Sequence, residues 1–119
     1  NGKKFYIGKN GKLINSNNIF EKNEPPIVFG NFKIDEFLDL KNFLINYKID
    51  LEKIEKYYYY KNKRWDLIFS NGLTLMLPSK NIEKSINIFK KLLNNNNLIS
   101  VKIVDLRVTN QIILTKNNE

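Results

Sequence analysis

The sequence predicts an α+β domain in which two amphipathic helices pack on a mostly antiparallel β-sheet. Two segments, one after residue 34 and one after residue 82, carry apolar residues at helical spacing. Around them lie short runs that alternate in hydrophobicity or are rich in aromatic residues, as strands are. No series of alternating strands and helices is evident. The chain of 119 residues suits one domain with a real core, spanning residues 1–119.

The N-terminal part is expected to begin with two short strands. Residues 5–7 and 13–14 are apolar and flank a turn that contains two glycines. Residues 15–24 are polar and expected to be irregular, and the proline pair that follows forces an extended backbone over residues 27–29. A first helix is predicted over residues 34–47, because its apolar residues lie three or four positions apart. These residues are Phe37, Leu40, Leu44 and Tyr47.

The centre of the chain predicts a three-stranded meander. Four consecutive tyrosines, 57–60, belong to a strand that leads through a turn into a β-hairpin over residues 64–78. A two-residue turn at Asn71-Gly72 would place Asp66 opposite an apolar residue. A three-residue loop with Gly72 in a left-handed conformation makes one face wholly apolar, and we favour this register. It pairs Phe69 with Leu73, Leu67 with Leu75, and Trp65 with Leu77.

The C-terminal part predicts a second helix and two strands. Ser79 is the expected N-cap of the helix, which should end at the asparagine run 94–97. Its apolar face comprises Ile82, Ile86, Phe89 and Leu93. Strands are predicted over residues 101–108 and 111–115. Both helices are expected on one face of the sheet, above Trp65, Leu67 and Phe69.

The composition argues against an enzyme. The chain has no cysteine and no histidine, which removes thiolate chemistry and the commonest general base and metal ligand. Asp66 and Asp105, the acids inside predicted strands, each lie two residues from an arginine, Arg64 and Arg107. Residues two apart share a strand face, so each pair is predicted to be a local ion pair. We therefore expect no enzymatic activity, no cofactor and no metal.

The net charge of +8 raises nucleic-acid binding as an alternative function. Such a module would use the tyrosines 57–60 and the neighbouring lysines. However, only Arg64 and Arg107 of the 20 basic residues are arginine, the side chain best suited to phosphates and base edges. Side chains alternate along a strand, so one tyrosine pair is expected in the core and the other on the surface. We keep this alternative but expect no nucleic-acid partner.

The last predicted strand, residues 111–115, is the better functional candidate. It is short and apolar, and no lysine or proline blocks it before Lys116. Such an edge either accepts a strand of a partner or is covered by the rest of the fold, and the pattern leaves both open. No apolar run of about 18 residues is present that would span a membrane. The absence of an initiator methionine and of a signal peptide indicates a piece of a longer protein.

The hairpin segment 64–78, with its Arg-Trp-Asp-Leu start, Asn-Gly turn and Leu-Pro end, resembles the bacterial cell-division protein FtsQ, called DivIB in Gram-positive bacteria. The run Val-Asp-Leu-Arg at 104–107 supports the resemblance, as do Phe29-Gly30 and residues 8–12, which fit the start of that family's C-terminal β-domain. The resemblance covers essentially the whole chain. It implies a C-terminal periplasmic β-domain, with the transmembrane helix and the POTRA domain of the family absent from this chain.

The resemblance also implies a function. Members of that family are non-enzymatic divisome scaffolds of the inner membrane, and they bind FtsB and FtsL at the septum during its formation. A strand of FtsB adds to the last strand of the domain, and a basic residue near the tryptophan hairpin pairs with an acid of the partner. On this sequence the partner-binding residues become Lys63 or Arg64 for the basic position, and Val108, Thr109, Asn110, Gln111, Ile112, Ile113 and Leu114 for the strand. Val108 stands where many relatives have tyrosine, so an aromatic anchor is missing.

Overall fold

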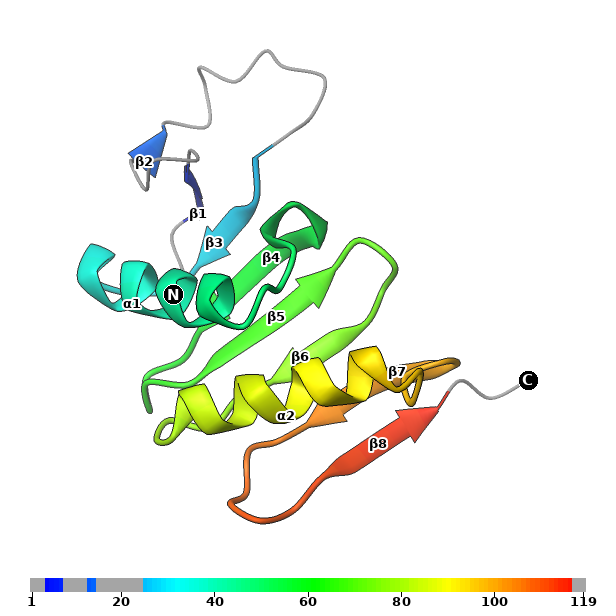
Figure 1. The fold of residues 1–119 in the computed structure, drawn as a ribbon. Coiled ribbons are helices and arrows are strands. Elements are labelled where there is room, and N and C mark those ends of the chain that lie inside the picture. The colour runs from blue at the N-terminus through cyan, green and yellow to red at the C-terminus, as the bar shows by residue number, and fades with distance from the viewer. Residues whose placement is uncertain (1–3, 8–12, 15–24, 117–119) are drawn as a thin grey trace.

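The computed structural model describes residues 4–7, 13–14 and 25–116, which form one sheet with two helices on it (Figure 1). Eight strands are described, and their order in the sheet is β2-β1-β3-β4-β5-β6-β7-β8. The strands are β1 (Lys4–Ile7), β2 (Leu13–Ile14), β3 (Ile27–Phe29), β4 (Ile54–Tyr59), β5 (Trp65–Phe69), β6 (Thr74–Met76), β7 (Val101–Asp105) and β8 (Ile113–Lys116). The helices are α1 (Ile34–Asn46), α2 (Ile82–Asn94) and a short 3₁₀ helix, η2 (Leu51–Lys53).

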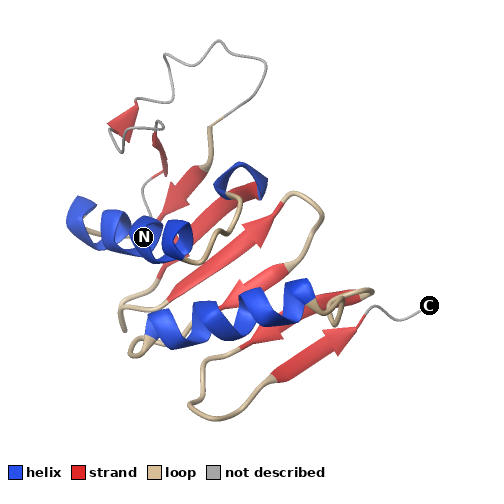
Figure 2. Cartoon of the chain, in the orientation of Figure 1, coloured by secondary structure: helices blue, strands red, loops and turns tan. Residues whose placement is uncertain are grey.

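The predicted α+β class with a mostly antiparallel sheet is confirmed. Five of the seven strand pairs are antiparallel, and the two parallel pairs are β3–β4 and β6–β7. Each parallel pair is joined by a helix, α1 in the first case and α2 in the second. These strand–helix–strand connections could not be predicted from the residue pattern, because β3 and β6 have only three residues each. Both connections run over the same face, so both helices cover one side of the sheet (Figure 2).

The β5–β6 hairpin has the predicted register. Leu67 lies opposite Leu75. The Phe69 amide donates to the Leu73 carbonyl at 2.8 Å. Gly72 has a φ of 91°, as a three-residue loop with a left-handed last residue requires. The wholly apolar face therefore forms as expected and is buried, since Leu67 and Leu75 are both 0% exposed.

The core lies between this face of the sheet and the two helices. Below α1, an aromatic cluster joins Phe37 to Tyr57 with ring centroids 4.9 Å apart, and to Trp65 at 5.9 Å. Below α2, Phe89 packs on Phe69 with centroids 5.5 Å apart. The prediction that the helices cover Trp65, Leu67 and Phe69 is confirmed by the burial of all three residues. Burial of this apolar surface is the main term that stabilises the domain.

The ends of some elements differ from the prediction. Helix α2 is capped by Asn81 in a left-handed conformation instead of by Ser79. The Leu93 side chain is 38% exposed and does not belong to the buried face, because the apolar stripe turns away from the sheet in the last turn. The strand predicted over 101–108 ends at Asp105, and the last strand begins at Ile113 instead of Gln111. The turn expected before residue 13 and the polar segment 15–24 lie outside the described residues.

Candidate partner-binding edge

Strand β8 is the last strand of the sheet and pairs only with β7 among the described strands (Figure 1). The pair is antiparallel, with Asp105 opposite Ile113 and Val104 opposite Leu114. The other side of β8 faces away from the sheet. The described end of the chain therefore forms an edge, as the sequence pattern predicts.

The outward-facing backbone groups of β8 follow from the register. In the parallel pair β6–β7, Met76 lies opposite Asp105, and its carbonyl accepts a hydrogen bond from the Leu106 amide at 2.9 Å. Leu106 thus directs its backbone groups towards β6, and Asp105, one residue earlier, directs its own towards β8. Because Asp105 is opposite Ile113, the N–H and C=O of Ile113 point back to β7, and those of Leu114 point away from the sheet.

The side chains along this edge are apolar and accessible. Ile112 is 48% exposed and Ile113 is 43% exposed. Leu114 is half-buried against the core, on the face that the helices cover. No charged side chain precedes Lys116 in the strand, so the usual protection of an edge against strand addition is missing.

The residues predicted to form the binding strand divide into two groups. Ile113 and Leu114 lie in β8. Val108, Thr109, Asn110, Gln111 and Ile112 precede it, in the loop between β7 and β8. The loop turns there because Asn110 has a φ of 64° and the Gln111 amide donates to the Val108 carbonyl at 3.1 Å. Strand β8 is therefore shorter than the predicted binding segment, and it extends to Lys116.

The two candidates for the basic position have different surroundings. The Nη1 atom of Arg64 lies 2.8 Å from the Asp66 carboxylate and 3.1 Å from the Leu77 carbonyl oxygen. The guanidinium carbon lies 5.0 Å from the centre of the Tyr60 ring, and the side chain is only 14% exposed. Arg64 is thus engaged within the domain. Lys63 is exposed in the turn between β4 and β5, and it is the better placed of the two to meet a partner.

The second predicted ion pair is also present. The Arg107 guanidinium contacts the Asp105 carboxylate through two hydrogen bonds of 2.7 and 2.9 Å. These bonds hold the pKa of Asp105 below its ordinary value. Asp105 lies opposite Ile113, so this pair is beside the candidate edge, on the face without helices. Its role in the described structure is that of a local ion pair, as predicted.

The four tyrosines at 57–60, of which the first three lie in β4, do not form a common surface. Tyr57 is 1% exposed in the core, and Tyr58 stacks on Phe29 on the opposite face with ring centroids 4.6 Å apart. The Tyr59 hydroxyl donates to Glu36 at 2.6 Å, and burial together with this hydrogen bond raises the pKa of Tyr59 to about 12. Tyr60 is 41% exposed, with Arg64 over its ring. No stacking platform for bases is present in this strand.

Within residues 4–7, 13–14 and 25–116, no three acidic, histidine or cysteine side chains are grouped as metal ligands. In the same residues, no helix is long and apolar enough to cross a bilayer.

The fold and its edge define the class of the protein as an α+β domain with an unblocked outer strand, a form suited to protein–protein contacts. The family model described as "Cell division protein FtsQ/DivIB, C-terminal" matches residues 1–107. The chain therefore belongs to the FtsQ/DivIB C-terminal family, a non-catalytic family of cell-division scaffold proteins. No curated protein matches the chain. The match includes the hairpin and β7, whereas β8 follows the matched residues.

Proposed function

We propose that this cell-division scaffold domain captures a strand of an FtsB-like partner on the outer edge of β8. The observation that carries the proposal is the apolar, unblocked edge at which Leu114 directs its N–H and C=O away from the sheet. Strand addition would satisfy these groups and cover the exposed Ile113 side chain. FtsL is the second partner that we propose, in the same complex.

Lys63 is proposed as the charge that fixes the orientation of the partner. The β4–β5 turn and the β7–β8 loop lie at the same end of the sheet, because β5 begins there and β7 ends there (Figure 1). The two are separated by three strand spacings, about 14 Å. A partner segment that continues beyond β8 across this end can bring an acidic residue to Lys63. Charges at the rim of an interface mainly set register and association rate.

Family membership supports the location that we propose. Scaffold proteins of cell division act at the septum, and we place this domain in the periplasm as part of a protein anchored in the inner membrane. The family match supports a divisome component. The septal position and the anchor are proposals that the full gene sequence and the localisation of a fluorescent fusion can test.

The first experiment is a calorimetric titration with the periplasmic segment of the FtsB-like protein from the same genome. Leu114→Pro removes the outward N–H, whereas Leu114→Ala shortens the side chain and keeps this donor. We expect saturable binding by the unchanged domain, loss of binding in Leu114→Pro and retention of most of it in Leu114→Ala. Proline at Ile113 is unsuitable, because that residue bonds to β7.

Hydrogen exchange gives a second measurement on the unchanged domain. On binding, the amide of Leu114 should become protected, and the amides of Ile113 and Thr115 should change little because they already face β7. Binding of normal affinity in a folded Leu114→Pro variant, or an unprotected Leu114 amide in the complex, would exclude strand addition at this edge.

A further inference from the structure

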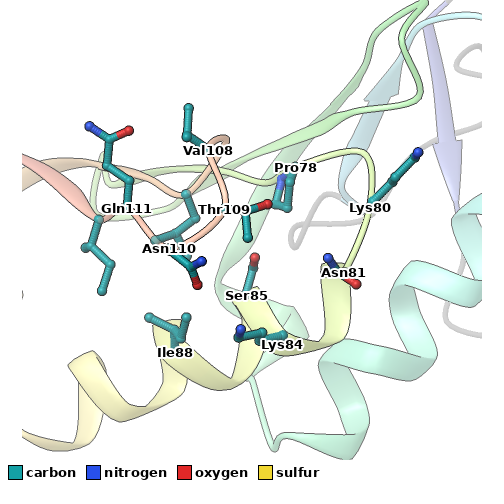
Figure 3. Close-up of a pocket in the computed structure, with 12 residues that line it drawn as sticks. Pro78, Lys80, Asn81, Lys84, Ser85, Ile88, Val108, Thr109, Asn110 and Gln111 are labelled. Atoms are coloured by element: carbon teal, nitrogen blue, oxygen red, sulfur yellow. The ribbon is translucent and has the colours of Figure 1, made fainter.

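A cavity of about 230 Å³ lies between the first turns of α2 and the β7–β8 loop (Figure 3). Asn81, Lys84, Ser85 and Ile88 line it from α2. Thr109, Asn110 and Ile112 line it from the loop. The cavity thus lies where the chain approaches β8. Ile112 lines the cavity, and the next residue, Ile113, is the first residue of β8.

Ser85 is the unusual residue of this cavity. The residue is only 8% exposed, and its hydroxyl bonds to no other residue among 25–116. Because no buried side-chain oxygen or nitrogen in these residues lacks a partner, the Ser85 hydroxyl must open to the space of the cavity. In Figure 3 its oxygen points from α2 into the cavity, towards Thr109. Serine is also a poorer helix former than alanine, so helix propensity does not explain this residue. A ligand in the cavity can replace water at this hydroxyl and form a hydrogen bond with it.

The electrostatic environment favours an anion. The cavity is at the N-terminus of α2, where the first backbone N–H groups have no acceptor within the helix and Asn81 provides no side-chain cap. Lys84 forms no ion pair with an acid in the described part of the chain. Glu83, the acid of this turn, accepts a hydrogen bond from the Tyr47 hydroxyl at 3.4 Å and does not line the cavity. Figure 3 shows Lys80 extending away, so Lys84 is the nearer cation.

The shape of the cavity favours a carboxylate on an aliphatic stem. Its walls include the apolar side chains of Pro78, Ile88 and Leu106, which can contact methylene groups. A phosphate with two charges is better held by an arginine fork, whereas the cations that line this cavity, Lys80 and Lys84, are both lysines. The mouth is flanked by exposed Val108 and Ile112, at 57% and 48%, as a polypeptide contact would require.

We propose that this cavity binds an acidic side chain, glutamate or aspartate, of the polypeptide that pairs with β8. Because the cavity adjoins the edge at β8, we assign its ligand to the same polypeptide that pairs with this strand. The inference therefore depends on the proposed function. The carboxylate would accept hydrogen bonds from Ser85 and from free amides at the start of α2, and Lys84 would balance its charge. This contact is separate from the one proposed at Lys63, which lies in the turn between β4 and β5.

The test in the complex is a set of double-mutant cycles. Each acidic residue of the partner segment is changed to its amide and titrated against the unchanged domain and against Lys84→Met and Ser85→Ala. We expect one acidic residue whose replacement weakens binding about tenfold, with most of this loss absent in the Lys84→Met domain. Lys91→Met, in the last turn of the same helix, is the matched control and should leave the loss unchanged. If no acidic residue is coupled to Lys84 or Ser85, the proposal is wrong.

A second test does not need the partner. The domain labelled with ¹⁵N is titrated with N-acetylglutamate N-methylamide and, as control, with the glutamine analogue. The glutamate compound alone should shift the amides of residues 81–85 and 109–111, with smaller shifts in Ser85→Ala. Equal shifts with both compounds, or none at saturating concentrations, would overturn the proposal. If the glutamate shifts appear but the partner segment does not bind, the cavity is retained and the proposed capture at β8 fails.

Discussion

Two arginine–aspartate pairs of the same spacing should contribute very differently to stability. The side chains of Arg64 and Asp66 are 14% and 8% exposed, whereas Arg107 is 48% exposed beside Asp105. Removal of Arg64 leaves the buried Asp66 carboxylate without its partner. We expect Arg64→Ala to lower the free energy of unfolding by about 3 kcal/mol, because an uncompensated buried charge is costly. Arg107→Ala should lower it by about 1 kcal/mol or less, as for exposed pairs.

Urea denaturation of both variants measures this difference. A double variant, Arg64→Ala with Asp66→Asn, is the control: it should recover part of the loss because the uncompensated charge is gone. Equal losses for Arg64→Ala and Arg107→Ala would contradict the assignment of Arg64 to the interior. Arg64 would then again be a candidate for the basic residue that contacts a partner.

Single residues also show why the site could be predicted only in part. Lys63 and Arg64 are adjacent in sequence, and no pattern states that Arg64 bonds Asp66 and the Leu77 carbonyl while Lys63 remains exposed. Ser85 gave no signal either, because an isolated serine in a helix resembles a surface residue. It is buried because the β7–β8 loop closes over α2, and this contact is between segments distant in sequence.

At the scale of elements, two glycines test how closely the strands pack. Gly30 and Gly72 both have positive φ values, 115° and 91°. A Cβ at Gly30 would collide with the Tyr59 carbonyl oxygen of the neighbouring strand, whereas one at Gly72 would meet open space. We expect Gly72→Ala to lower the free energy of unfolding by about 1 kcal/mol, because only backbone strain opposes it. Gly30→Ala should cost about 3 kcal/mol or more, because β3 must also move away from β4.

Thermal and urea denaturation of the two variants compare these costs directly. Gly72→Asn is a useful control, since asparagine tolerates a positive φ better than alanine and should recover part of the loss. If Gly30→Ala lowered the free energy of unfolding no more than Gly72→Ala does, Gly30 would not lie as close to β4 as the structure indicates.

The elements that could be predicted are those whose residues carry their own pattern. The β5–β6 hairpin has alternation on both arms and a loop whose glycine sets the register, so local chemistry determined it. The apolar stripes of α1 and α2 likewise made the two helices predictable. The parallel pairing of β3 with β4 and of β6 with β7 was not predictable, because three-residue strands carry almost no periodicity. The start of β8 was missed because the turn at Asn110 depends on its left-handed conformation.

At the scale of the whole molecule, the net charge of +8 acts mainly on encounter with partners. The tyrosines that would stack on bases are divided between the core, an intramolecular stack and an arginine contact. In the part of the chain that the structure describes, these tyrosines therefore form no aromatic groove of the kind that binds single-stranded nucleic acid. An acidic protein partner, in contrast, would be attracted by the field and then held by backbone hydrogen bonds at β8.

This division of roles predicts how salt affects binding of the FtsB-like segment. The association rate constant should fall about tenfold as the salt concentration rises from about 50 to 500 mM, because screening removes long-range attraction. The dissociation rate constant should change little, since backbone bonds and apolar contacts at β8 are short-ranged. Stopped-flow fluorescence with a labelled segment measures both constants. A dissociation rate that carries most of the salt dependence would mean that charge pairs, and not the strand edge, hold the complex together.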